Sequence, residues 1–269
     1  MGKGRATTAA LLGLLLLFLG CVPCPPQEPR LVDDFAGLTG SLRLEFATSQ
    51  GRQVAYYLEP PATPGQPPTR LAILYPGIGS VALGWLRFID RAAAPDTGWL
   101  LLDYPGRGDC EGALDPADLY RSSEGALAAL AVHYGVARLE AELALLGHSF
   151  GSGAAMQFAA RRPVRRIVLV APFDTLRRAA ALKSWFLALI MPRQIDNLAL
   201  TAGLLQAPDP PAITVFHGTS DKILPVEMGR NIRAAAPERI DYREFPGDGH
   251  IDILFTRRAE IIGALTSRE

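Results

Sequence analysis

Short apolar runs, separated by helical or glycine-rich stretches, recur along most of the chain. Near the start, residues 41–46 alternate apolar and polar, and residues 54–58 form a second run after a Ser-Gln-Gly-Arg turn, which predicts an antiparallel hairpin. A last strand is predicted over 241–245. The other runs are continuously apolar, as is typical of strands covered on both faces: 71–75, 99–102, 143–146, 166–170 and 213–216.

Helical stretches follow most of these strands. They are predicted over 83–94, from Asp115-Pro116 to about Tyr134, after Ser149, within 175–207, from Pro225 to about Ala236, and at the C-terminus. This alternation predicts an α/β fold, a doubly wound, mostly parallel sheet with an antiparallel N-terminal hairpin. Residues 175–207 interrupt the alternation, so we expect them to form a small helical cap inserted in the domain.

The size and charge of the chain indicate one large domain. The chain has 269 residues, 49% of them hydrophobic, which suffices for a single α/β core over 41–269. Its 27 basic and 27 acidic residues balance, so nothing indicates a nucleic-acid partner. Its three cysteines and four histidines are scattered, so we expect no metal site.

The N-terminus has the pattern of a targeting segment. Lys3 and Arg5 precede an apolar run over 11–19, which is too short for an ordinary membrane-spanning helix and predicts a signal peptide over 1–20. Its end, Phe18-Leu19-Gly20-Cys21, resembles a bacterial lipobox, although leucine is usual where Phe18 stands. The resemblance implies a lipid-modified Cys21 that anchors the protein to a membrane. The alternative is a signal peptide with an incidental cysteine.

Residue 22 and the proline-rich stretch after it extend this picture. Val22 is not the aspartate that marks inner-membrane retention, so the expected location is the bacterial cell envelope, at the outer membrane facing the periplasm. Residues 21–40 contain four prolines and are expected to form a semi-rigid tether. If Cys21 is lipidated, Cys24 and Cys110 remain, and they could pair in an oxidising compartment.

The candidate chemistry begins at residues 147–151. The apolar run before them leads into Gly147-His148-Ser149-Phe150-Gly151, and small residues follow. The pattern G-x-S-x-G between a strand and a helix is that of a nucleophile elbow, a strained turn that exposes its serine at the edge of the sheet. Gly147 and Gly151 fit because strand and helix pass too closely there for a Cβ.

Two further residues complete a candidate triad. Asp221 and His250 follow Ser149 in the order nucleophile, acid, histidine, and each of the three lies at a predicted strand end. A serine hydroxyl needs a base to take its proton, and the base needs an orienting acid. Asp174, one strand earlier, is the rival acid. His148 is expected to be a spacer, His217 a structural residue, and Asp103 and Asp109 braces of a glycine-rich loop.

From about residue 41 onward the chain resembles α/β-hydrolase-fold serine hydrolases, closest to a compact bacterial branch. The resemblance rests on the elbow, the Asp103–Gly112 loop, Pro172-Phe173-Asp174, His217–Asp221 and Gly249-His250. It implies Ser149 as nucleophile, His250 as base and Asp221 as orienting acid. It also implies oxyanion donors at the backbone N–H groups of Phe150 and Ile78, and a small-molecule acyl ester substrate cleaved without a cofactor.

The chain departs from the branch at two places, and two other functions compete. Pro76-Gly77 stands where His-Gly is usual, and Ile251-Asp252 follows the histidine. A dinucleotide-binding function is one alternative, based on the loose match to G-x-G-x-x-A over 77–82. It leaves the elbow, Asp221 and His250 without a role. The other alternative is a non-catalytic, hydrolase-like envelope lipoprotein that binds a ligand or partner.

Overall fold

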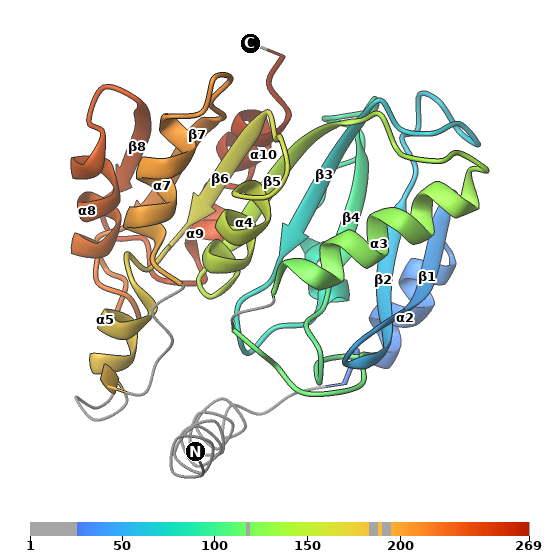
Figure 1. Ribbon diagram of the computed structural model, residues 1–269, viewed down its shortest axis with the longest axis horizontal. Helices are drawn as coiled ribbons and strands as arrows, with labels where there is room; N and C mark the ends of the chain where they lie inside the picture. The colour runs from blue at the N-terminus through green and yellow to red at the C-terminus, as the bar shows by residue number, and fades with distance from the viewer. Residues whose placement is uncertain (1–25, 117–118, 183–187, 190–194, 269) are drawn as a thin grey trace, which may run out of the picture.

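The computed structural model describes residues 26–116, 119–182, 188–189 and 195–268, and its centre is an eight-stranded sheet (Figure 1). The strands lie in the order β1-β2-β4-β3-β5-β6-β7-β8. Strand β2 is antiparallel to both of its neighbours, and the pairs from β4 to β8 are parallel. The predicted α/β fold is therefore confirmed. The strands are β1 (Ser41–Thr48), β2 (Gly51–Leu58), β3 (Arg70–Tyr75), β4 (Gly98–Leu102), β5 (Glu142–His148), β6 (Arg166–Val170), β7 (Ala212–Gly218) and β8 (Ile240–Phe245).

Helices cover both faces of the sheet, and each face has its own apolar core. Figure 1 shows α3, α4, α7 and α8 in front of the sheet and α2 and α10 behind it. In the described part of the chain, no helix is both long and apolar enough to cross a membrane. The helices are α2 (Pro29–Ala36), the 3₁₀ helix η1 (Ala82–Arg87), α3 (Tyr120–His133), α4 (Gly151–Ala159), α5 (Leu176–Ala181), α7 (Asn197–Leu205), α8 (Glu227–Ala235), α9 (Ile253–Thr256) and α10 (Arg258–Thr266).

Part of the expected tether is folded against the domain. Pro29 stands in the first turn of α2, where its fixed φ suits a helix, and Leu31 and Phe35 lie one turn apart on its buried face. The Phe35 ring meets Tyr56 edge to face, with 5.2 Å between the ring centroids. The tether prediction was therefore wrong for residues 29–36, because this apolar pair gives the segment a face to bury.

The helix predicted over 83–94 is shorter than expected. Only η1 forms, and it ends at Arg87. Beyond it, the Asp90 carboxylate accepts hydrogen bonds from the N–H groups of Ala92 and Ala93, both at 3.1 Å. These side-chain bonds offer the backbone an alternative to helix. Helix α3 likewise begins at Tyr120 and not at the predicted Asp115-Pro116.

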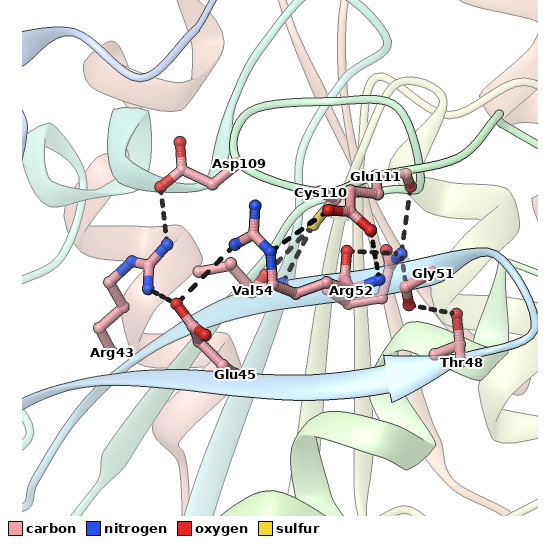
Figure 2. A network of polar contacts seen from close by, with 10 residues as sticks. Arg43, Glu45, Thr48, Gly51, Arg52, Val54, Asp109, Cys110 and Glu111 are labelled. Atoms are coloured by element: carbon pink, nitrogen blue, oxygen red, sulfur yellow. Dashed lines mark hydrogen bonds and ion pairs between the residues drawn. The ribbon is translucent and has the colours of Figure 1, made fainter.

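The glycine-rich loop over 103–112 is fastened to the β1–β2 hairpin (Figure 2). Glu111 accepts a hydrogen bond of 2.9 Å from the Arg52 N–H. Asp109 accepts bonds from Arg43 and, at 2.8 Å, from the Tyr56 hydroxyl, so it braces the loop as expected. The buried Cys110 thiol contacts the backbone of Val54, and burial raises its pKa to about 12. Cys24, its possible partner, lies outside the described residues.

The two described helices of the expected cap differ in position. Helix α5 lies beyond the carboxyl ends of the strands in Figure 1, whereas α7 packs beside α4 and α8 on one face of the sheet. The Asn197 amide at the start of α7 donates hydrogen bonds to the Phe173 carbonyl, at 2.8 Å, and to the Ser152 hydroxyl, at 3.1 Å. Helix α7 therefore belongs to the covering layer of the sheet. Residues 183–187 and 190–194 lie outside the described residues, and the cap stays a prediction.

Candidate active site

The turn between β5 and α4 holds Ser149 in a strained conformation. Its φ of 54° lies in the left-handed region, which costs a residue other than glycine about 1–3 kcal/mol. Its N–H donates to the Val170 carbonyl at 2.9 Å, which holds the strained residue in place. A Cβ on Gly147 would lie 2.5 Å from the Gly151 carbonyl oxygen, and one on Gly151 would overlap the Tyr75 carbonyl. Both glycines are therefore required by the close passage of strand and helix.

The structure brings Ser149, His250 and Asp221 together at the carboxyl edge of the sheet. The His250 Nε2 lies 2.9 Å from the Ser149 Oγ, and its Nδ1 lies 2.7 Å from the Asp221 Oδ2. All three residues are buried. Ser149 follows β5, Asp221 follows β7 and His250 follows β8, so three strand ends converge on one hydrogen-bonded chain. This geometry can pass a proton from the serine to the histidine while the carboxylate holds the ring.

Asp221 is built to stay ionised. Its other oxygen accepts hydrogen bonds from the N–H groups of Ile223, at 2.8 Å, and Leu224, at 2.9 Å. Burial alone would raise the pKa of Asp221, but the hydrogen bonds from His217 and His250 outweigh burial and lower that pKa. A carboxylate that stays charged can stabilise a positively charged imidazole beside it.

Asp174, the rival acid, faces away from this chain of contacts. Its carboxylate accepts hydrogen bonds from the Thr175 N–H, from the Arg178 guanidinium and, at 2.8 Å, from the Asn231 amide. It is fully buried, and these bonds satisfy its charge. Its contacts therefore hold the start of α5 against α8.

His148 and His217 contact the triad in ways that the sequence did not reveal. The His148 Nε2 lies 2.9 Å from the carbonyl oxygen of His250, and the two rings are 5.0 Å apart. A carbonyl only accepts, so this nitrogen carries the proton. Burial, and then the charge of His250, lower the pKa of His148 to about 4. His217 donates to the Leu224 carbonyl at 2.9 Å and lies 3.4 Å from the Asp221 Oδ2. His148 is the last residue of β5 and His217 is the last but one of β7, and this position at the strand ends is the signal that could have pointed to them.

The two predicted oxyanion donors belong to the turn that holds Ser149 and to a second loop. Phe150 follows it directly, and Ile78 belongs to the loop after β3. Neither backbone N–H donates a hydrogen bond to any other described residue, which leaves both available to a ligand. Tyr104 braces this region, because its hydroxyl donates to the Pro76 carbonyl at 2.8 Å and its ring meets Phe150 edge to face.

Asp103 and Gln27 hold the beginning of η1, just after the Ile78 loop. The Asp103 Oδ1 accepts the Ala82 N–H at 2.8 Å, and its Oδ2 accepts the Gln27 amide, whose oxygen accepts the Leu83 N–H at 3.3 Å. Burial raises the pKa of Asp103 to about 7, against the lowering effect of the Ala82 bond. With its carboxylate occupied in this way, Asp103 does not fit the ribose-binding role of the dinucleotide alternative.

A cavity of about 490 Å³ opens beside Ser149 and His250. It is bounded by the loop after β3, by η1 and by the segment 250–255. This volume lies within the usual range of ligand pockets, about 300–1,000 Å³. Among the described residues, including those that line this cavity, no group of three or more His, Cys, Asp or Glu side chains is arranged so that it could hold a metal ion.

Comparison with known proteins identifies a related segment. Residues 126–253, from α3 to the start of α9, match the family model described as serine hydrolase. Two uncharacterised proteins of Mycobacterium tuberculosis, one from each of two strains, are 30% identical over 153 residues, which make up 57% of this chain and 53% of theirs. The chain thus spans about half the length of these curated relatives.

Solved structures share the fold. An esterase domain from a Rhodothermus marinus protein superposes with a TM-score of 0.61 at 17% identity, covering 84% of this chain and 96% of that one. A Xanthomonas campestris α/β serine hydrolase without a lid gives 0.57 at 18% identity, with 84% and 94% covered. A Pyrococcus furiosus esterase gives 0.61 at 14% identity, with 88% and 93% covered. The chain therefore has the α/β-hydrolase fold, and its residues 126–253 are similar to serine hydrolases.

Proposed function

We propose that the protein is a serine hydrolase that cleaves an ester or related acyl bond through an acyl-enzyme. The observation that carries the proposal is the continuous chain from Ser149 through His250 to Asp221, at 2.9 and 2.7 Å. Two structures that share the fold are described as esterases, which favours an ester over other acyl bonds. The open cavity beside the serine gives such a substrate access.

The proposed reaction has two halves. In the first, His250 Nε2 takes the hydroxyl proton as the Ser149 Oγ attacks the substrate carbonyl, and the oxyanion accepts hydrogen bonds from the Ile78 and Phe150 N–H groups. Each such donor typically stabilises a transition state by about 3 kcal/mol. The tetrahedral intermediate then collapses, and the alcohol leaves with the proton from His250. In the second half, water attacks the acyl-enzyme with His250 again as base, and the freed acid leaves Ser149 restored.

A fluorophosphonate probe tests the proposal directly. The wild-type protein is expected to form a covalent adduct on Ser149, because an activated serine attacks the phosphorus centre, and Ser149→Ala is expected to form none. The measurement is the mass of the intact protein, with the site assigned by peptide mapping. Ser220→Ala is the matched control: it removes an exposed serine from another strand end and is expected to label as wild type does. Folded wild-type protein that stays unlabelled would favour the non-catalytic alternative.

We further propose that Cys21 anchors the protein to the bacterial outer membrane, facing the periplasm. The support is the sequence over 18–21 and the apolar run before it. In cells that process lipoproteins, Cys21→Ser is expected to move the protein from the membrane fraction to the soluble fraction, because the acyl chains are lost. Cys110→Ser is the matched control, since that thiol is buried within the domain. Unchanged partitioning of Cys21→Ser would rule the anchor out.

A further inference from the structure

The cavity beside Ser149 has walls of a distinct chemical character. Trp85, Phe88 and Leu254 line it and belong to the apolar core behind the sheet, and Val81, which also lines it, is buried. Most of this wall is hydrocarbon, and burying a hydrocarbon ligand against it removes apolar surface from water.

The rim of the cavity is apolar as well. Ile223, Ile251 and Phe255 line the cavity, yet they are 46%, 56% and 49% exposed. A group of large, exposed apolar side chains around a pocket is typical of a binding surface. They come from the loop after β7 and from the residues after His250, so the rim lies directly against the triad.

The charges around the cavity are neutralised. Among the described residues that line it, Arg87 carries the one Lys, Arg, Asp or Glu charge, and its guanidinium is paired with Glu28 at 2.6 Å. His148, with its pKa lowered to about 4 mainly by burial, is neutral at ordinary pH. A charged substrate group would thus lose its hydration on entry and find no unpaired opposite charge among the described lining residues.

We infer that this cavity holds an uncharged, medium-length hydrocarbon chain of the substrate, next to the bond that is cleaved. The inference rests on the proposed function of the triad and adds the substrate class. The hydrocarbon chain enters past the exposed rim and lies against the buried walls, and the ester carbonyl lies between Ser149 and the N–H of Ile78.

A chain-length series tests the inference. For p-nitrophenyl esters from acetate to octanoate, kcat/KM is expected to rise by up to about fourfold per methylene, because each one buries apolar surface. A parallel series of alkyl acetates lengthens the alcohol instead, and the series that shows the rise identifies which side of the ester the cavity holds. An ester of the same length that ends in a carboxylate is expected to lose most of the gain. If kcat/KM changes little with length in both series, the inference is wrong.

Gly84 allows the cavity to be filled. It lines the cavity, and a Cβ built on it meets nothing within 4 Å, so Gly84→Trp can begin its side chain without a clash at the Cβ. In the series that shows the rise with wild type, the ratio of kcat/KM for the longest ester to that for the shortest is expected to fall by about tenfold or more, since the cavity no longer has room for several methylenes that contribute about fourfold each. Gly263→Trp is the matched control, an exposed glycine of α10 with equally open space, and should keep the wild-type ratio.

A second variant tests the pocket again, and a compact probe tests the triad separately from the pocket. Phe255→Asp changes an exposed rim residue, so it tests the same ratio with little risk to folding. An unchanged ratio in both Gly84→Trp and Phe255→Asp would overturn the inference. Labelling of the wild type by the compact diisopropyl fluorophosphate reports the triad independently of chain length. Labelling without chain-length dependence overturns only the pocket, whereas no labelling of folded protein overturns the proposed function itself.

Discussion

Replacing Ser149 by alanine is expected to lower kcat for a p-nitrophenyl ester by about 10⁴-fold or more. The substitution removes the attacking oxygen but leaves the Ile78 and Phe150 N–H groups and the cavity in place, so a small residual rate is expected. His250→Ala should cost a similar factor, because the hydroxyl loses the base that lies 2.9 Å away. The measurement is steady-state kcat on protein purified free of host esterases.

The double variant sharpens this prediction. If Ser149 and His250 act as one unit, Ser149→Ala with His250→Ala should be about as slow as either single variant, and not slower by the product of the two factors. Near-normal kcat in either single variant would contradict the assignment. Thermal melts of all three proteins control for unfolding, and Ser220→Ala again serves as the neutral serine replacement.

Replacing Asp221 by asparagine is expected to lower kcat by about 10⁴-fold while the fold is kept. The amide is nearly isosteric with the carboxylate, but it is uncharged and can turn an N–H toward the His250 Nδ1. The ring would then hold its proton on the wrong nitrogen for accepting one from Ser149. The bonds from the Ile223 and Leu224 N–H groups need only a carbonyl oxygen, so the loop itself can persist.

Asp174→Asn is the matched comparison for the acid. It makes the same chemical change at a buried aspartate one strand earlier, whose partners are Thr175, Arg178 and Asn231. A fall in kcat of less than about tenfold is expected, since none of these partners belongs to the triad, although loss of the Arg178 ion pair should lower the melting temperature. A large loss of kcat in Asp174→Asn with a mild one in Asp221→Asn would reverse the assignment.

Much of the site was predictable because its residues follow a local rule. Ser149, Asp221 and His250 each lie in the turn or loop that follows a strand, and parallel strands bring their carboxyl ends to one edge. The glycines of the elbow were predictable for the same reason, since the close passage of strand and helix is a property of a five-residue pattern. The confirmed fold followed from the alternation of apolar runs and helical stretches.

What could not be predicted depends on contacts between distant segments. The bond from His148 to the His250 carbonyl joins residues far apart in the chain, and no local pattern records it. Gln27 is buried against Asp103 within a stretch whose prolines indicate a tether. The helix that was predicted beyond Arg87 but does not form has a different cause. The Asp90 side chain accepts a hydrogen bond from a nearby backbone N–H, and this bond competes with helix formation.

The packing of Gln27 against the domain limits the distance between the domain and a lipid anchor at Cys21. Cys21 and Gln27 are six residues apart, and an extended chain spans at most about 3.3–3.6 Å per residue, or roughly 21 Å in all. That is about half the thickness of a bilayer with its headgroups. With Cys21 acylated, as we propose, the apolar rim would stay within the first few nanometres of the lipid surface. The rate of turnover would then depend on the surface density of an amphiphilic substrate in the lipid layer more than on its concentration in solution.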